Sequence, residues 1–506
     1  MAVLATLLSA ALAGIDGRLV RVEVDVSPGL PSFTVVGLPD TSVRESRDRV
    51  RTAIRNSGFE FPWQHITINL APPDVRKEGA AYDLPIALGI VAATGALPAR
   101  EYGDIVVVGA LSLDGDVRPT GGVLPVAIAA ARAGIGAALV PEANAAEAAV
   151  VDGLAVWPAV TLDEAAATLA ERRDDRRYRH IDVPAPADVA GAWGDFADIR
   201  GQAMARRALE VAAAGGHHVL LTGPPGSGKT MMARSLAGIL PPLSPAESLE
   251  VTSIHSVAGL LPGGTGLIRN RPFRAPHHTI SDVALVGGGT HPRPGELSLA
   301  HAGVLFLDEM PEFERRALEV LRQPLEEGRV RIARAAASVE FPASVTLVGA
   351  MNPCPCGYFG HPARACRCAP PQRERYAARI SGPLLDRIDI RVDVPWLPPD
   401  VLGDERLQEG SADIRARVVR ARDAQSARRP ETGADVNARL SGKMLRRFAR
   451  PDEGGRLLLH GAVERLAMSG RAHDRILRVA RSIADLAGRA HVVADDVAEA
   501  LQYRLG

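Results

Sequence analysis

Apolar and polar residues alternate with two different periods along the first third of this chain. At 19–26 the run Leu-Val-Arg-Val-Glu-Val-Asp-Val changes polarity at nearly every position, which predicts a half-buried β-strand. Other segments place apolar residues three or four apart, which predicts α-helices. We therefore expect residues 1–170 to form one α/β unit. The predicted strands are 19–26, 33–37, 65–70 and 105–113, and the predicted helices are 40–57, 83–95, 122–134 and 163–172.

A change of composition ends this unit. Charged residues crowd 171–179 and prolines follow, a combination typical of a linker, which we place at 171–194. A new series of helical and strand patterns predicts a second α/β unit at 195–395. Residues 396–506 carry Arg, Ala and Leu at helical spacing and predict a small helical domain. Such a division is expected because 506 residues exceed the size of one ordinary core.

Composition excludes some classes of protein and leaves others open. With 46% hydrophobic and 23% charged residues, the chain is expected to fold into globular units. Its formal net charge is zero, which gives no support to a nucleic-acid partner but does not exclude a basic channel within a ring. The apolar residues 1–15 resemble a signal peptide, yet no Lys or Arg precedes them and they continue into the strand at 19–26. We expect a cytoplasmic protein without a membrane span.

One glycine-rich segment carries a specific signal for phosphate binding. Residues 223–230, here called the phosphate loop, match G-x-x-x-x-G-K-[ST] between an apolar strand at 218–222 and a helical stretch. Lys229 is suited to reach the β- and γ-phosphates of ATP, and the Thr230 hydroxyl to ligate Mg²⁺. The alternative is a glycine-rich turn with an incidental lysine. The predicted nucleotide contacts are Gly223, Pro224, Pro225, Gly226, Ser227, Gly228, Lys229 and Thr230.

A second apolar run weakens that alternative. Residues 304–307 have the character of a buried parallel strand and end in Asp308 and Glu309. We expect Asp308 to hold Mg²⁺ through water and Glu309 to polarise the attacking water. A third strand at 345–351 ends at Asn352, which is placed to orient that water beside the γ-phosphate. Together these residues predict ATP hydrolysis.

Arg387 follows a short helical turn that begins at residue 381. An arginine in this position is suited to stabilise transition-state charge in the nucleotide site of a neighbouring subunit. It therefore predicts a motor rather than a plain kinase or GTPase. The alternative is a surface ion pair with Asp386 or Asp389.

All the cysteines of the chain fall in one short segment. In a reducing compartment such clustering favours a metal over disulfides, and four thiolates can close a tetrahedral Zn²⁺ site. The intervening loop also carries His361 as a substitute ligand. The alternative is a loop with four reduced thiols. The candidate ligands are Cys354, Cys356, Cys366 and Cys368, in two C-x-C pairs.

Basic residues crowd the segment between the phosphate loop and the acidic strand. Arg271 and Arg274 precede His277 and His278 there. One interpretation is a loop in the pore of a ring, where the arginines meet DNA phosphates. The other is packing between subunits around buried histidines.

Three longer runs point to one family. They are Arg-Pro-Phe-Arg-Ala-Pro-His-His-Thr-Ile-Ser at 271–281, Pro-Gly-Glu-Leu-Ser-Leu-Ala-His-Ala-Gly at 294–303 and Met-Asn-Pro-Cys-Pro-Cys-Gly at 351–357. With the motifs above, they resemble the magnesium-chelatase-like AAA+ proteins of the ComM/YifB type over essentially the whole chain. The resemblance implies a homohexameric, DNA-dependent ATPase with helicase and branch-migration activity. Its implied role is to integrate single-stranded DNA during natural transformation.

The same resemblance implies roles for basic residues elsewhere. It maps Arg471 onto the lid arginine that touches the γ-phosphate, with Arg475 as the alternative. It also identifies residues 326–341 as a hairpin of the kind that points into the pore of related ring helicases. We favour Arg331 and Arg334 as DNA contacts because alternate positions on a strand face one way.

The N-terminal unit resembles the Lon-protease fold. Ala81 stands in the position of the Lon serine and Leu124 in that of its lysine, so this unit lacks the groups for peptide hydrolysis. The implied fold class is a multidomain α/β protein with a Lon-protease-like α/β domain, a central AAA+ P-loop domain and a C-terminal helical lid.

Other functions remain to be weighed against a DNA motor. The main alternative is a chelatase-type AAA+ motor subunit that acts on a protein partner. The N-terminal unit and the cysteine loop favour the DNA motor, because plain chelatase motor subunits lack that N-terminal domain. An ATP-gated scaffold is disfavoured because Glu309 is intact, and a Lon-type protease because of Ala81 and Leu124.

Overall fold

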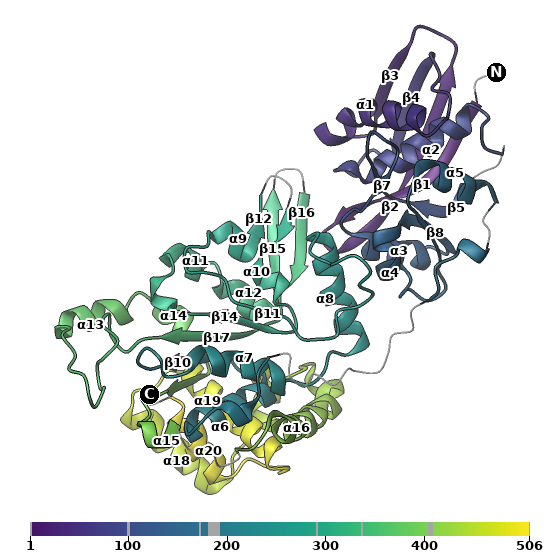
Figure 1. The fold of residues 1–506 in the computed structure, drawn as a ribbon. Helices are drawn as coiled ribbons and strands as arrows, with labels where there is room; N and C mark the ends of the chain where they lie inside the picture. The colour runs from purple at the N-terminus through teal and green to yellow at the C-terminus, as the bar shows by residue number, and fades with distance from the viewer. Residues whose placement is uncertain are drawn as a thin grey trace.

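The chain is a mixed α/β multidomain protein with a helical C-terminal part (Figure 1). The predicted linker falls largely at 181–192, outside the residues described by the structure. None of the helices in the described ranges has the length and apolar character needed to cross a membrane. The structure, a computed structural model, describes residues 3–98, 102–171, 174–180, 193–289, 292–334, 337–402 and 408–504.

A seven-stranded sheet in the order β3-β4-β2-β1-β5-β8-β9 forms the centre of the N-terminal part. β2 alternates as predicted, with Val20, Val22 and Val24 fully buried. β1 and β4 flank it and run antiparallel to it, whereas β5, β8 and β9 are parallel to one another. The elements are β1 (Val3–Ala13), β2 (Asp16–Ser27), β3 (Ser32–Val36), α1 (Thr41–Asn56), β4 (His65–Ala71), α2 (Asp83–Ala93), β5 (Tyr102–Val107), β6 (Ala110–Leu111), β7 (Val117–Arg118), α3 (Val123–Arg132), β8 (Ala137–Pro141), α4 (Ala145–Ala148), β9 (Ala155–Ala159) and α5 (Leu162–Glu171).

The apolar start of the chain forms β1, a strand that the sequence pattern did not predict. β1 pairs with β2 along its whole length, from Val3↔Val26 to Ala13↔Asp16. A continuous apolar run does not by itself distinguish a strand from other buried segments. The turn after β1 reaches the second α/β part, because a side chain at Gly14 would meet the backbone oxygen of Glu340 at 2.6 Å.

A second contact joins the N-terminal part to α8 (Pro245–Val257). The Gly122 N–H donates to the carbonyl oxygen of Ser256 at 3.0 Å, and the Ser256 hydroxyl donates to Glu147 at 2.5 Å. Glu147 also accepts the N–H of Leu124 at 3.2 Å, and burial raises its pKa. The segment that carries Leu124 therefore forms part of a contact between the two α/β parts.

The second sheet is parallel throughout, in the order β11-β14-β17-β10-β18. Its central strands are buried on both faces, as their continuous apolar runs predicted. The strands are β10 (Val219–Thr222), β11 (Phe273–Arg274), β14 (Val304–Leu307), β17 (Thr346–Met351) and β18 (Ile390–Asp393). The helices around the sheet are α6 (Ala203–Gly215), α7 (Lys229–Ile239), α9 (Asp282–Val286), α10 (Glu296–Leu299), α11 (Arg315–Glu319), α12 (Arg322–Glu327), α13 (Pro370–Ala377), α14 (Gly382–Leu385) and α15 (Pro399–Leu402).

Two small ribbons extend from this sheet. β12 (Gly287–Gly288) pairs with β13 (Arg293–Pro294), and β15 (Arg329–Arg334) pairs with β16 (Ala337–Pro342). The β15–β16 ribbon coincides with the predicted hairpin and rises towards the N-terminal part in Figure 1.

The C-terminal helices pack on α6 and α7 of the second α/β part rather than forming a separate core. α16 and α19 contact α6, and α16 also contacts α7. One hydrophobic cluster includes Val219 and Phe306 of the sheet together with Ile476 and Val497 of the C-terminal helices. The helices are α16 (Ser411–Thr432), α17 (Gly442–Phe448), α18 (Glu453–Arg465), α19 (Gly470–Leu486) and α20 (Ala494–Gln502), drawn in light green to yellow in Figure 1.

Candidate active site

The phosphate loop lies between β10 and α7, where β10 ends. Gly226 and Gly228 have φ angles of 78° and 90°, in the left-handed region that glycine adopts without strain. A side chain at Gly223 would come within 2.2 Å of the Val394 carbonyl oxygen. The path of the loop therefore requires these glycines. α7 begins directly at Lys229, so its unpaired N–H groups and positive end are available to an anion.

The Lys229 ammonium connects the phosphate loop to the neighbouring strand β17. Its Nζ donates to the carbonyl oxygens of Gly223 and Pro224 at 2.7 and 2.9 Å, and to Asn352 Oδ1 at 3.3 Å. Burial lowers the pKa of Lys229, while the Asp308 carboxylate acts in the opposite direction. Lys229 and Asn352 are thus brought together as the sequence motifs suggest, because β10 and β17 are parallel neighbours that end at one edge.

Two oxygen donors at the same edge fit a magnesium ion. The Thr230 hydroxyl donates to Asp308 Oδ2 at 3.0 Å, which places both candidate ligands side by side. The other oxygen, Asp308 Oδ1, accepts the backbone N–H of Glu309 at 2.9 Å. Hydroxyl and carboxylate oxygens are the donors that Mg²⁺ prefers, so the residues present fit the ion.

Glu309 directly follows Asp308 with an unusual backbone and an accessible carboxylate. Its φ angle of 50° is left-handed, a conformation that costs a non-glycine residue free energy and is often found at functional sites. Its side chain is 55% exposed, as a base that activates water requires.

His278 is a neighbour of Glu309 that the sequence motifs did not assign to this site. Its Nδ1 lies 3.7 Å from Glu309 Oε2. The ring stands edge-on to Phe313 and close to the ring of His277, with centroids 4.1 Å apart in the histidine pair. β11 pairs with β14, so the residues that follow these strands meet at one edge. The paired strands are far apart in the sequence, so no local pattern predicts that His278 approaches Glu309.

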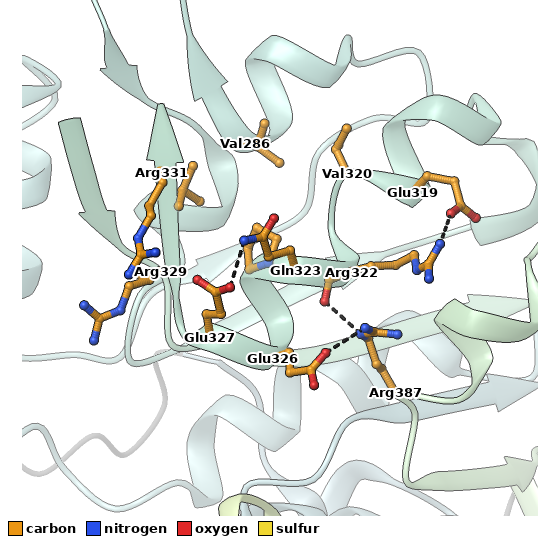
Figure 2. A pocket seen from close by; sticks show the side chains of 12 residues that line it. Val286, Glu319, Val320, Arg322, Gln323, Glu326, Glu327, Arg329, Arg331 and Arg387 are labelled. Carbon is orange, nitrogen blue, oxygen red and sulfur yellow. Dashed lines mark hydrogen bonds and ion pairs between the residues drawn. The ribbon is translucent and has the colours of Figure 1, made fainter. Parts of the chain in front are cut away.

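Arg387 lies near the opposite ends of the strands, where β10 and β18 begin. It precedes β18, whose first residue Ile390 is paired with Val219, the first residue of β10. Its guanidinium lines a pocket of about 500 Å³ and donates to Glu326 at 2.7 Å and to the Arg322 carbonyl oxygen at 2.8 Å. Figure 2 shows both contacts as dashed lines. The alternative partners Asp386 and Asp389 are wrong for Arg387, because they pair with Arg475 and His217 instead.

The two lid arginines differ in exposure. Arg475 is 3% exposed and pairs with Asp386 at 3.0 Å, so α19 begins beside the turn that carries Arg387. Arg391 and Arg504 are also near, and burial together with Arg475 lowers the pKa of both. Arg471, one helical turn before Arg475, is exposed. The geometry therefore leaves Arg471 accessible, whereas Arg475 is engaged within the chain.

Comparison with known proteins gives a consistent result along the chain. Family models described as "Magnesium chelatase, subunit ChlI", "Subunit ChlI of Mg-chelatase" and "Magnesium chelatase, subunit ChlI C-terminal" match residues 195–402, 22–144 and 408–504. The competence protein ComM of Haemophilus influenzae is 43% identical over 514 residues, which cover 99% of this chain and 97% of ComM. The YifB protein of Escherichia coli (strain K12) is 42% identical over 494 residues, which cover 97% and 95% of the two chains.

The chain belongs to the ComM/YifB family of magnesium-chelatase-like proteins. This membership confirms the resemblance inferred from the motifs, and it implies an AAA+ ATPase that uses ATP and Mg²⁺. A more distant similarity extends to Lon protease 1 of Hydrogenovibrio crunogenus, with 27% identity over 162 residues, 30% of this chain and 20% of that protease.

Arg271 and Arg274 of this ComM/YifB-type chain are engaged in internal ion pairs. The Arg271 side chain is 13% exposed, pairs with Glu247 at 3.1 Å and donates to the Ala302 carbonyl oxygen at 2.5 Å. Arg274 makes two hydrogen bonds to Glu296, at 2.6 and 2.7 Å. These contacts within the chain favour packing over a pore loop. The histidines of the packing interpretation are not buried, because His277 is exposed and His278 is partly exposed.

The β15–β16 hairpin shows which arginines share the exposed face of β15. Along β15 the exposed side chains are at 329, 331 and 333, while Val330 and Ile332 are buried. Arg331 therefore shares its face with Arg329. Positions three apart on a strand do not share a face, so the reason for grouping Arg331 with Arg334 was wrong. The side chain of Arg334 lies outside the described residues. Arg329 and Arg331 both pair with Glu340, at 2.6 and 3.0 Å.

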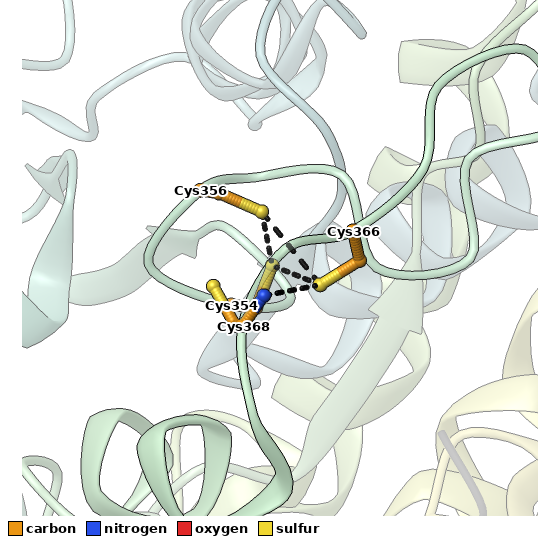
Figure 3. Close-up of side chains that lie close together, drawn as sticks. All are labelled: Cys354, Cys356, Cys366 and Cys368. Atoms are coloured by element: carbon orange, nitrogen blue, oxygen red, sulfur yellow. Dashed lines mark hydrogen bonds between the residues drawn. The ribbon is translucent and has the colours of Figure 1, made fainter.

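The four cysteines come together as the spacing suggested. Their sulfur atoms all lie within 4.8 Å of one another, from two turns that follow β17 and precede α13 (Figure 3). Cys354 is buried, and the other three are partly exposed. Backbone N–H groups of Tyr358 and Arg367 lower the pKa of Cys356 to about 6. The donor set fits a thiophilic ion such as Zn²⁺.

Proposed function

We propose that this chain is an ATP-driven motor acting on single-stranded and branched DNA. The observation that supports ATP hydrolysis best is the meeting of Lys229, Thr230, Asp308, Glu309 and Asn352 at one sheet edge. Lys229 neutralises the β- and γ-phosphates, and Thr230 and Asp308 hold Mg²⁺, which when bound neutralises charge on the phosphate oxygens. Glu309 takes a proton from the attacking water, and Asn352 orients that water.

We propose a ring because the site is incomplete within one chain. Arg387 lies before β18 and beyond the start of β10, whereas Lys229 follows the end of β10. A strand of four residues spans about 13 Å, which exceeds the reach of an arginine side chain. We infer that Arg387 serves the ATP of a neighbouring subunit, in a head-to-tail contact that closes into a homohexamer, and that the exposed Arg471 contacts the γ-phosphate in the assembled ring.

DNA is the proposed substrate for two reasons. A full-length relative is named a competence protein, and competence for transformation requires handling of incoming DNA. The β15–β16 hairpin also presents Arg329 and Arg331 on one exposed face, where both guanidinium groups can exchange their pairing with Glu340 for contacts to phosphates. We propose that ATP hydrolysis drives branch migration, which integrates single-stranded DNA during natural transformation or homologous recombination.

ATP hydrolysis measured with and without single-stranded DNA tests this function. We expect DNA to stimulate the rate several-fold, and we expect the Lys229→Ala variant to hydrolyse no ATP under either condition. If the wild-type chain hydrolyses ATP at a rate that DNA does not change, the alternative of a chelatase-type motor on a protein partner replaces the proposal. If it hydrolyses none, the assignment of the phosphate loop is wrong.

A further inference from the structure

The cysteine cluster has the dimensions of a metal site. Cys354 Sγ lies 3.4 Å from that of Cys356 and 3.6 Å from that of Cys366, and the last two are 3.7 Å apart (Figure 3). Four thiolates around Zn²⁺ at the usual Zn–S distance of about 2.3 Å are separated by about 3.8 Å at the corners of a tetrahedron. A disulfide would require a separation of about 2.05 Å. The observed distances therefore match metal ligation and not cross-linking.

The cluster is packed directly against the ATP site. Gly357, one residue after Cys356, has a left-handed φ of 82° and touches the phosphate loop. A side chain at Gly357 would come within 2.7 Å of Pro225 Cδ and 3.9 Å of Asn352 Cγ. Asn352 itself stands two residues before Cys354. The first C-x-C turn thus supports both the outer side of the phosphate loop and the end of strand β17.

The second C-x-C pair lies near the other end of the segment 352–376, which connects β17 to α13. Cys368 is followed by α13, and Tyr376 of that helix is buried. Burial raises the pKa of Tyr376 to about 12. A hydrogen bond from the backbone of Asn352 has the opposite, smaller effect and links the helix to the end of β17. The polypeptide from 352 to 376 therefore leaves the sheet beside the ATP site and returns to it. The four cysteines bring the two halves of this segment together, because their sulfur atoms lie within 4.8 Å of one another.

We propose that the four cysteines bind one Zn²⁺ per chain and that this metal-held turn sets the position of the phosphate loop and Asn352. A closed thiolate site of this kind contributes rigidity and not a reactive position. Removal of the metal frees the first C-x-C turn, and Pro225 loses its support. The second half of the proposal rests on the proposed ATPase function, whereas the metal site does not.

Metal content tests the first half. Full-length protein purified without chelators is expected to contain one zinc per chain, and a thiol-modifying mercurial is expected to release it. Protein produced with Co²⁺ is expected to show the visible absorption of a tetrahedral thiolate complex, and the Cys356→Ser/Cys366→Ser variant to lack it. Protein that contains no zinc and gives no such spectrum with Co²⁺ overturns the metal site, whatever its ATPase activity.

Two glycine variants test the second half without touching a ligand. Gly357→Ala and Gly360→Ala impose similar backbone strain, since φ is 82° and 78°, but a side chain at Gly360 meets nothing within 4 Å. Both are expected to keep their zinc. Gly357→Ala is expected to lower kcat/KM for ATP roughly 10- to 100-fold by displacing the phosphate loop. Gly360→Ala, which changes only exposed backbone, is expected to stay within about twofold of wild type.

The outcomes separate the two claims. Equal kcat/KM in the two glycine variants overturns the proposed support of the phosphate loop, even if zinc is present. Binding of a fluorescent ATP analogue to each variant gives a second readout, and its weakening in Gly357→Ala alone is expected. A wild-type chain that binds zinc but neither binds nor hydrolyses ATP contradicts the proposed function and, with it, the coupling, while the metal site stands.

Discussion

Replacement of Glu309 by Gln is expected to separate ATP binding from ATP hydrolysis. The carboxylate is 55% exposed, and Nδ1 of the His278 ring lies 3.7 Å from it. Glutamine has the same shape and keeps a carbonyl oxygen, so the fold loses little. Asp308, which contacts Thr230, is untouched, and the residues that hold Mg²⁺ and the phosphates remain in place.

These contacts determine how much Glu309→Gln is expected to change stability, hydrolysis rate and ATP affinity. A conservative change at an exposed position alters the free energy of unfolding by less than about 0.5 kcal/mol. Loss of a general base lowers a rate by about 10²- to 10⁴-fold, because the attacking water no longer gives up its proton in the transition state. The dissociation constant for ATP is expected to change little, since Lys229 and Thr230 make their hydrogen bonds to residues other than Glu309.

Steady-state hydrolysis and equilibrium ATP binding measure the two effects separately. The matched control is Glu312→Gln, the same substitution three residues later, where the carboxylate pairs with Arg379 at 2.6 Å. That control is expected to hydrolyse ATP within about twofold of wild type. If Glu309→Gln keeps more than about a tenth of the wild-type turnover, Glu309 is not the base.

Further predictions concern charged residues in and around the ATP site. Lys229→Ala is expected to weaken ATP binding roughly 10- to 100-fold, because charge-assisted bonds to the phosphates are lost; unchanged affinity in a binding titration refutes its role. Arg387→Ala and Lys229→Ala are each expected to be inactive alone but to regain part of the hydrolysis when mixed, since some interfaces then join an intact Lys229 to an intact Arg387; no recovery after verified subunit exchange contradicts action between subunits. Arg331→Ala is expected to reduce the salt dependence of single-stranded DNA binding by about one unit of slope in log Kd against log salt; an unchanged slope removes Arg331 from the DNA contacts. Asp386→Ala leaves the buried Arg475 without its carboxylate and is expected to lower the free energy of unfolding by about 1–3 kcal/mol in a denaturant titration, and an unaltered midpoint counts against this pair.

The elements with a local signal were predicted well. The helix predicted at 40–57 is α1 (Thr41–Asn56), and the alternation at 19–26 lies within β2 (Asp16–Ser27). The phosphate loop follows β10 and precedes α7 as predicted, and its backbone path requires the glycines that the motif contains. In each case the deciding interactions lie within a few residues of one another, so the pattern along the chain contains them.

Distant pairings that no recognisable motif marks were not predicted. β1 is stabilised by β2 and by a turn that reaches Glu340, and its own sequence is only a continuous apolar run. His278 comes close to Glu309 because β11 pairs with β14. Arg271 is engaged by Glu247 and by the Ala302 carbonyl oxygen, which the local sequence does not connect to it.

One prediction, the grouping of two hairpin arginines on one face, applied strand geometry wrongly. Arg331 and Arg334 were expected on one face, but positions three apart on a strand face opposite ways. The exposed face instead carries Arg329 with Arg331. The cysteine cluster shows the converse, since its four members are close in sequence and its spacing alone indicated a common site.

Displacement of a labelled strand from a three-stranded DNA junction tests the central claim most directly. The account predicts displacement by the wild-type chain that requires ATP and Mg²⁺, and no displacement by Lys229→Ala or Glu309→Gln protein that still binds the junction. Wild-type protein that hydrolyses ATP and binds the junction, yet releases no strand, would contradict the claim that this ATPase is a DNA motor.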